Sequence, residues 1–161
     1  MNKPIVGIIM GSESDLDIMQ AAADTLAEFG VAHEVRIISA HRTPDVMADY
    51  AATAAERGLK VIVAGAGGSA HLPGMTASHT PLPVIAVPVK RDSHDHEALW
   101  SNIKMPPGVP LATLPENGAR NAALLAVEIL ALSDPELATR YATFRQTQHD
   151  AVIAADRKIN T

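Results

Sequence analysis

The sequence predicts a three-layer α/β fold in which helices cover both faces of a five-stranded parallel sheet. Short continuous apolar runs alternate about five times with segments of helical periodicity over 161 residues. Continuous runs are typical of strands buried on both faces of a parallel sheet, and right-handed crossovers place the intervening helices on its two sides. Because this length suits one domain and no linker or repeat divides the chain, we expect a single α/β domain over residues 1–161.

The first two strand–helix units carry clear helix signals. Residues 4–10 (PIVGIIM) form the first expected strand, and Gly30 ends the helix that follows, as a glycine just beyond a helix end does. The apolar positions of this helix recur at spacings of three and four: Leu16, Met19, Ala23, Leu26 and Phe29. After the second expected strand, residues 32–38, Pro44 stands in the first turn of a helix that Gly58 ends. We expect its buried stripe at Val46, Tyr50, Ala51 and Ala54.

The remaining elements alternate in the same way. The expected strands are residues 60–64, 82–87 and 109–114, and the expected helices are residues 72–78, 98–103, 118–132 and 134–153. Asp134 suits the N-cap of the last helix, and Pro135 and Glu136 suit its first turn. This C-terminal helix, about 134–153, has no strand left to cover, so we expect it to pack either on a neighbouring subunit or on its own chain.

Composition and charge exclude several classes of function. The formal net charge is −5 and there is no basic run, which argues against a nucleic-acid surface. The chain has no cysteine, so disulfides and thiolate chemistry are excluded. No apolar stretch approaches the ~20 residues that cross a bilayer, and the N-terminus shows no export signal. We therefore expect a soluble cytoplasmic protein with no membrane or nucleic-acid partner.

Three clusters of small and polar residues stand where expected strands end. They cover residues 11–15 (GSESD), 39–44 (SAHRTP) and 65–74 (GAGGSAHLPG). Ligands of open parallel sheets bind outside the carboxyl ends of the strands, so the three clusters should meet at one edge. Together they supply hydroxyls, backbone N–H groups, an arginine, a carboxylate and two histidines. These groups predict a site for a phosphorylated small molecule with a proton-transfer group beside it.

The first two clusters each have a chemical and a purely structural interpretation. Ser12 and Ser14 can donate to a phosphate at a helix N-terminus, and Asp15 can accept from ribose hydroxyls, but a serine N-cap with an acidic first turn explains the same residues. Arg42 can grip a phosphate with its fork of donors, and His41 can transfer protons near neutral pH. A solvated surface loop also explains this His-Arg pair.

The third cluster favours close approach of a ligand. Four glycines in residues 65–74 let backbone N–H groups reach a ligand without obstruction by Cβ atoms. The start of this cluster matches the dinucleotide fingerprint G-x-G-x-x-[GA], although the match falls in the third strand–helix unit and lacks a clear ribose-binding acid. Residues 92–96 (DSHDH) could hold a metal, but no further cluster completes such a site, so we expect none. The isolated histidines have a surface or structural interpretation: His33, His79 and His149.

Taken together, GSESD, SAHRTP and AGAGGSAHLPGM, in this order and spacing, strongly resemble the N5-carboxyaminoimidazole ribonucleotide mutase family, which is also described as the catalytic subunit of phosphoribosylaminoimidazole carboxylase. The resemblance extends through PLPVIAVPV, MPPGVPLAT and GARNAALLAVEIL, and so covers nearly the whole chain. It implies a flavodoxin-like fold, a homo-octamer with sites shared between subunits, and a reaction without metal, nucleotide or organic cofactor. In that reaction of purine biosynthesis, a carboxylate moves from the exocyclic nitrogen of an aminoimidazole ribonucleotide to ring carbon C4.

The resemblance also implies a role for each site residue. His41 would be the general acid and base. The ribonucleotide would be bound by Ser12, Asp15 and Arg42, with Ser14 and Ser39 helping to hold its phosphate. The pocket for the base and the carboxylate would be lined by Gly67, Gly68, Ala70, His71 and Leu72, and the expected substrate-binding set is completed by Gly11 and Ala66.

One stretch departs from the family pattern. Residues 96–106 read HEALWSNIKMP, with Lys104 where glutamine is usual, and residues 99–105 look like the related branch that carboxylates aminoimidazole ribonucleotide directly with CO2. Arg42 and the loop GAGGSAHLPG favour the mutase. The alternatives are a direct CO2-dependent carboxylase and, from another class, a non-catalytic nucleotide- or flavin-binding module. Lys104 could add a cation near the carboxylate or face solvent.

Overall fold

Five parallel strands form the central sheet of this computed structural model, which describes residues 3–91 and 95–160. The strands are β1 (Val6–Met10), β2 (His33–Ile37), β3 (Val61–Gly67), β4 (Val84–Val89) and β5 (Ala112–Thr113). Their order across the sheet is β2-β1-β3-β4-β5, and every pair is parallel. This arrangement confirms the predicted fold class. It also places a switch in strand order between β1 and β3, where open α/β sheets bind ligands.

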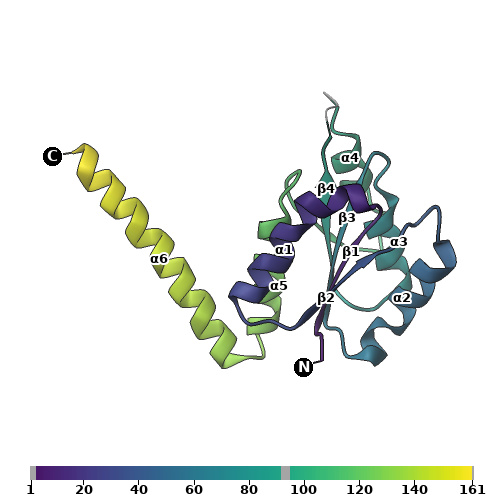
Figure 1. Ribbon diagram of the computed structural model, residues 1–161, viewed down its shortest axis with the longest axis horizontal. Coiled ribbons are helices and arrows are strands. Elements are labelled where there is room, and N and C mark those ends of the chain that lie inside the picture. Colours follow the sequence, from purple (N-terminus) through teal and green to yellow (C-terminus); the bar gives the residue numbers. More distant parts are fainter. Residues whose placement is uncertain (1–2, 92–94, 161) are drawn as a thin grey trace.

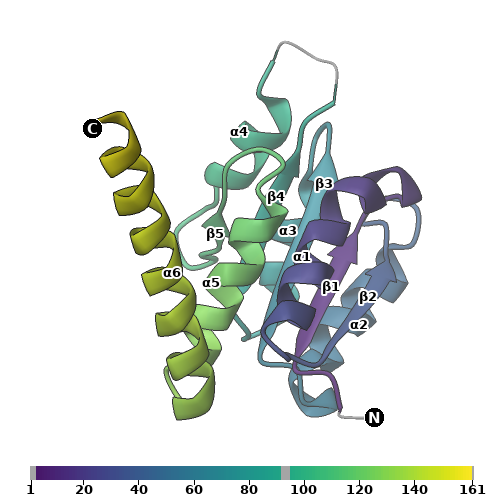
Figure 2. The ribbon, with the colours of Figure 1, turned by 60° about the vertical axis from the view of Figure 1, so that its left-hand side comes forward.

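Helices cover both faces of the sheet (Figure 1). They are η1 (Glu13–Asp15, a 3₁₀-helix), α1 (Leu16–Glu28), α2 (Pro44–Arg57), α3 (His71–His79), α4 (Glu97–Ile103), α5 (Ala119–Ala131) and α6 (Pro135–Ile159). Side chains of α1 and α5 pack on one face, and side chains of α2, α3 and α4 pack on the other. Figure 2 shows α1 and α5 in front of the strands and α2 and α3 behind them. Across the described ranges 3–91 and 95–160, none of the helices has the length and apolar character needed to span a membrane.

The alternation of strand side chains separates two cores. In β1, Ile8 and Met10 pack with α1 and α5, whereas Ile9 packs with α2, since successive side chains of a strand lie on opposite faces. Burial on both faces explains why β1, β3 and β4 read as continuous apolar runs. The edge strand β2 differs, because its Val35 and Ile37 are exposed.

Three elements begin or end three or more residues away from the predicted position. β3 continues through the start of the glycine-rich cluster to Gly67, because Gly65, Ala66 and Gly67 pair with β4. Sheet pairing here overrides the low strand propensity of glycine. β5 shrinks to two residues, since only Ala112 and Thr113 pair with β4. α6 continues past residue 153 to Ile159.

Two residues predicted to be buried are exposed. Val46 is 41% exposed, and Met47 is buried in its place. The reason is helical phase: position 47, with 50, 51 and 54, completes one i, i+3, i+4, i+7 stripe, and position 46 lies about 100° away from it. Leu16, the first residue of α1, is 37% exposed. The other predicted positions of these two stripes are buried.

The last helix docks on its own chain only near its start. Asp134 Oδ1 accepts a hydrogen bond from the Leu137 backbone N–H at 3.0 Å, which confirms the predicted N-cap. Leu137 is buried, and the rings of Phe29, Tyr141 and Phe144 contact one another with centroids 5.4–6.2 Å apart. Residues 145–160 are all exposed, and Figure 1 shows α6 extending away from the rest of the molecule toward the C-terminus. Packing within one chain therefore accounts for only the first part of α6.

Candidate active site

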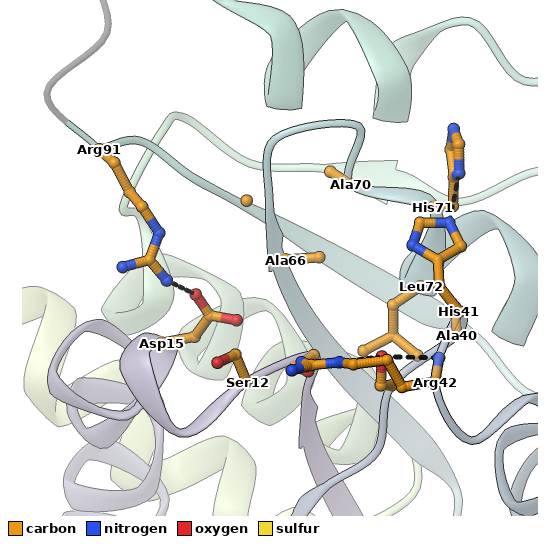
Figure 3. A pocket seen from close by; sticks show the side chains of 13 residues that line it. Ser12, Asp15, Ala40, His41, Arg42, Ala66, Ala70, His71, Leu72 and Arg91 are labelled. Atoms are coloured by element: carbon orange, nitrogen blue, oxygen red, sulfur yellow. Dashed lines mark hydrogen bonds and ion pairs between the residues drawn. The ribbon is translucent and has the colours of Figure 1, made fainter.

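A cavity of about 300 Å³ opens at the carboxyl ends of the central strands (Figure 3). Its lining residues are Gly11, Ser12, Asp15, Ser39, Ala40, His41, Arg42, Ala66, Gly67, Ala70, His71, Leu72 and Arg91. Of the predicted site residues, all of which the structure describes, only Ser14 and Gly68 lie outside this lining. The three clusters therefore meet at one edge of the sheet, as their strand-end positions predicted.

Backbone hydrogen bonds bring the clusters together. The Gly11 N–H donates to the Gly65 carbonyl at 3.2 Å, and the Ile38 N–H donates to the Met10 carbonyl at 2.8 Å. The first bond continues the ladder between β1 and β3, and the second continues the ladder between β1 and β2. The relative positions of the clusters are thus set by the register of the sheet.

The first cluster combines a helix cap with a buried carboxylate. The Ser12 side chain caps η1: its Oγ accepts from the Ser14 N–H at 3.4 Å and from the Ser14 hydroxyl at 2.9 Å. The capping interpretation of this serine is therefore correct, and Ser12 also lines the cavity. Asp15 is only 2% exposed, so a group that usually stays in water lies in the cavity wall.

The second cluster holds Arg42 in a fixed place. Ser39 Oγ accepts from the Arg42 backbone N–H and from its Nε, both at 3.2 Å. Arg42 Nη2 donates to the Gly11 carbonyl at 2.6 Å, which joins the second cluster to the first. The loop is itself closed by Thr43, whose Oγ1 accepts from the Ser39 N–H at 3.0 Å. A solvated loop needs none of these bonds, so the arginine is pre-oriented over the cavity.

Two histidines from different clusters face each other. His41 Nε2 and His71 Nδ1 are 2.8 Å apart, and the two rings are perpendicular. A hydrogen bond at this distance needs a proton on one of these two nitrogens and a lone pair on the other. The two nitrogens cannot both carry protons in this geometry. One of these two nitrogens therefore donates and the other accepts.

The third cluster supplies small walls and a tight turn. Ala70 and Leu72 are buried beside the cavity. Gly68 adopts a left-handed φ of +59°, which favours glycine, and it lines a separate cavity of about 200 Å³. The Ser69 hydroxyl donates to Glu97 Oε1 at 2.9 Å and so ties this turn to α4. At Gly67, a Cβ atom would stand 3.1 Å from the Val89 carbonyl oxygen, so the glycine allows β3 and β4 to end side by side.

Arg91 is a cavity residue that sequence reasoning missed. It follows β4, and its Nη2 donates to Ser14 Oγ at 2.7 Å and forms an ion pair with Asp15 Oδ1. The sequence does contain a signal for it, because Arg91 comes directly after a buried strand. The strand was predicted to end two residues early, at residue 87, and no role was predicted for Lys90 and Arg91.

Burial dominates the electrostatics of Asp15. Removal from water raises the pKa of this carboxyl above its ordinary value of 3.8, and the opposing effect of Arg91 is smaller. Asp17, nearby on α1, raises the pKa slightly further. The ionised form of Asp15 is therefore less favourable in the folded protein than in water, in spite of its ion pair.

One residue considered for a metal, His96, has another partner. His96 Nδ1 lies 2.9 Å from Glu116 Oε2, and Lys90 Nζ lies 3.4 Å from the same oxygen. Residues 92–94, which belonged to that interpretation, lie outside the described part of the chain. Within the described part, no three His, Cys, Asp or Glu side chains come together in a group that could hold a metal.

Other side chains singled out in the sequence lie away from the cavity lining. His79 and His149 are exposed, and His33 Nδ1 lies 2.9 Å from the Val31 carbonyl oxygen. Lys104 is exposed at the end of α4, with its Nζ 5.5 Å from the centre of the Trp100 ring. Of the two roles considered for Lys104, the structure favours the one in which it faces solvent.

Comparison with known proteins agrees with the geometry of the site. A family model described as AIR carboxylase matches residues 5–151. The chain belongs to this family. The resemblance inferred from the three motifs is therefore confirmed.

Relatives in the family carry two names. The chain is 53% identical to an N5-carboxyaminoimidazole ribonucleotide mutase of Mycobacterium tuberculosis, covering 98% of this chain and 91% of the relative. It is 51% identical to a chloroplastic phosphoribosylaminoimidazole carboxylase of Vigna aconitifolia, but spans only 28% of that protein's length. The crystal structure of Treponema denticola PurE superposes with a TM-score of 0.85 at 32% identity, covering 96% of this chain and 98% of that one.

We predict that Asp15→Asn gains stability relative to the wild type as pH rises. Because the pKa of Asp15 is raised above 3.8 in the folded protein, the folded state binds this proton more tightly than the unfolded chain. The wild type therefore loses stability as pH increases from 3.8 through the raised pKa. Asparagine does not titrate, so the variant does not lose this contribution to its stability. Thermal unfolding between pH 3.5 and 7 measures the difference, with Asp45→Asn as a control for removal of an exposed carboxylate. A variant that becomes less stable than the wild type as pH rises would contradict this assignment.

Proposed function

We propose that this protein is an N5-carboxyaminoimidazole ribonucleotide mutase of purine biosynthesis. The observation that carries the proposal is the pair of histidines, His41 and His71, hydrogen-bonded to each other at a cavity that also holds Arg42 and the acidic Asp15. An acid-base group, a phosphate-binding cation and a ribose-binding carboxylate are what this substrate requires. Identity of 53% over nearly the full length of a mutase supports the same reaction.

The cavity residues suit the parts of a ribonucleotide. We assign the phosphate to Arg42 and Ser12, because a guanidinium and a hydroxyl at a helix start are both good donors to phosphate oxygens. Asp15 would accept from ribose hydroxyls. Ala66, Ala70 and Leu72 would surround the flat imidazole with small apolar groups. Ser14, which is outside the cavity lining, would then act on the substrate only through its neighbours.

The reaction needs one group that both donates and accepts a proton. We assign this role to His41. As the N–CO2⁻ bond of the carbamate breaks, His41 donates its proton to the nitrogen, and CO2 and aminoimidazole ribonucleotide form in the cavity. C4 then attacks CO2 to form the new C–C bond, and the proton on C4 returns to His41. The imidazole ends in its starting state, so the atoms balance and no cofactor is consumed.

His71 would tune this proton transfer. Since His41 Nε2 and His71 Nδ1 share one hydrogen bond, His71 can fix which nitrogen of His41 carries its proton. The half-enclosed cavity would retain CO2 between the two steps. The direct carboxylase shares the second step, and it is the second candidate because residues 99–105 resemble that branch.

A comparison of substrates tests the function. We expect rapid conversion of the carbamate ribonucleotide without added bicarbonate, and slow conversion of aminoimidazole ribonucleotide even with bicarbonate. Product formation is followed by the absorbance of the carboxylated imidazole. Rapid turnover of aminoimidazole ribonucleotide alone would establish the direct carboxylase instead. A yellow purified protein with no turnover of either compound would favour the flavin-binding module.

We predict that His41→Asn lowers turnover by roughly 10²–10⁴-fold, the usual contribution of a general acid-base group. Asparagine keeps a polar side chain of similar reach but cannot transfer a proton, so the affinity for the ribonucleotide should change little. Turnover and ligand affinity are measured on the same preparation. His79→Asn, at the exposed end of α3, is the matched control. Full turnover by His41→Asn would remove His41 from the mechanism.

The proposal includes a homo-octamer built partly by α6. Residues 145–160 are exposed along their whole length, yet they include Val152, Ile153 and Ile159, which are 67%, 39% and 84% exposed. A neighbouring subunit would cover these side chains and remove their apolar surface from water. The single-domain organisation and the cytoplasmic location stay predictions of the sequence.

We expect a chain that ends at residue 144 to fold but to lose the octamer. Leu137, Tyr141 and Phe144, which contact the rest of the chain, are kept in this truncation. Light scattering after gel filtration gives the mass of the full and truncated chains, and circular dichroism checks that the truncated chain is folded. A folded truncated chain with the mass of the full assembly would show that α6 does not hold the subunits together.

A further inference from the structure

Asp15 is the acidic residue of the cavity lining, and it is almost fully buried. Its side chain is 3% exposed. A carboxylate in this position is costly unless it is paired, and it has several possible rotamers through which its two oxygens could exchange places. Whatever holds Asp15 therefore decides what the cavity presents to a ligand.

Arg91 is the group that holds it. The guanidinium reaches from the end of β4 to η1, and its Nη2 contacts both Asp15 Oδ1 and Ser14 Oγ. In Figure 3 the pair lies across the cavity from His41, with the second carboxylate oxygen turned away from Arg91 toward the side of the cavity where Ala66 lies. One oxygen of Asp15 is thus occupied, and the other is presented to the cavity.

Gly11 borders the cavity on the Oδ2 side of Asp15. A Cβ atom at Gly11 would stand 3.8 Å from Asp15 Oδ2 and 4.0 Å from the Ala66 Cβ. Both are ordinary contact distances, so the space between Oδ2 and Ala66 admits a group of methyl or hydroxyl size. Because Oδ1 already accepts from Arg91, Oδ2 is the oxygen that can accept from a ligand.

We propose that Arg91 is a positioning residue for the substrate: it holds Asp15 Oδ1, so that Oδ2 faces the cavity and accepts from the ribose hydroxyls. The inference rests on the proposed function in one respect, that the cavity takes a ribosyl phosphate. Arg91 acts through Asp15 and makes no direct contact with the phosphate, because its charge is already paired with the carboxylate.

A purely structural role explains the arrangement less well. The Arg91 side chain is 51% exposed although its partner Asp15 is buried, so solvent screens the guanidinium and reduces what the ion pair adds to folding stability. The ion pair does not overcome the burial of Asp15 either, since the pKa of that carboxyl remains raised. What the pair does accomplish is to fix the direction of one buried side chain at the cavity.

Binding of ribose 5-phosphate and of inorganic phosphate tests the inference. We expect Arg91→Gln to weaken ribose 5-phosphate binding roughly tenfold, or about 1.4 kcal/mol, as the loss of one well-placed hydrogen bond to a charged group does. The affinity for inorganic phosphate should stay within about twofold, because Arg91 makes no direct contact with the phosphate. Arg120→Gln is the matched control, because Arg120 also pairs with a carboxylate, that of Glu28, and is similarly exposed at 52%. Equal losses for both ligands would mean that Arg91 binds the phosphate directly, and would overturn the inference.

A double-mutant cycle with Asp15→Asn separates the two residues. If Arg91 acts through Asp15, the double variant binds ribose 5-phosphate no more weakly than Asp15→Asn alone. Arg91→Lys should restore part of the affinity, since lysine keeps the charge but not the guanidinium geometry. In turnover, Arg91→Gln should raise KM with little change in kcat, the pattern of lost uniform binding. Additive losses in the cycle, or a fall in kcat alone, would contradict the inference.

Failure of the inference and failure of the proposed function give different results. A wild type that binds ribose 5-phosphate but converts no carbamate ribonucleotide overturns the mutase alone, and the cycle still reports on Arg91. Turnover by the wild type with additive losses in the cycle overturns the role of Arg91 alone. A wild type that fails to bind ribose 5-phosphate at millimolar concentration overturns the inference as well, because no ribosyl site would then exist.

Discussion

The parallel pairing of β1 with β2 and β3 is the constraint on which the cavity depends. The register places Met10 beside Gly65 and beside Ile37, so the residues that follow each strand emerge at the same level. A bond of about 1 kcal/mol net, such as Gly11 N–H to Gly65 O, is individually modest. Slipping β1 or β3 by one residue would reverse every one of its side chains between the two cores, however, and both cores are buried. The hydrophobic effect therefore enforces the geometry of a polar site.

Glycines at buried strand positions, Gly7 and Gly65, allow the helices to pack close to the sheet. A Cβ atom at Gly65 would overlap the Met19 sulfur of α1, and one at Gly7 would overlap the Tyr50 hydroxyl of α2. Both helices thus lie closer to the sheet than larger residues would permit. Because α1 lies close to the sheet, η1 and its Asp15 lie at the carboxyl ends of the strands, where Arg91 follows β4 and pairs with Asp15. Asp15 is buried at this position, and its raised pKa shows that burial disfavours the ionised carboxylate.

The fold and most of the cavity could be predicted because they depend on local patterns. Apolar runs, the early proline at position 44 and the end glycines at 30 and 58 mark the elements, and strand-end clusters mark the site. The strand limits that failed depend on pairing across the sheet: β3 continues through glycines because β4 offers partners, whereas β5 has partners for only two residues. Arg91 belongs to the same class, since its importance comes from Asp15, 76 positions earlier in the chain. No pattern of residue spacing in the sequence predicts a contact between Arg91 and Asp15.

The two names within the family describe reactions with a common chemical basis. Relatives called mutase and carboxylase are 53% and 51% identical to the chain, so overall similarity does not separate them. Both reactions end with C4 of the same ribonucleotide attacking CO2, and that step needs a base, a pocket for CO2 and a ribosyl-phosphate site. The difference lies only in the source of CO2, for which a mutase must first protonate a carbamate nitrogen. Under the proposed mutase mechanism, the hydrogen-bonded pair His41 and His71 would supply that proton and later recover it, so a single small cavity would serve both halves of the reaction.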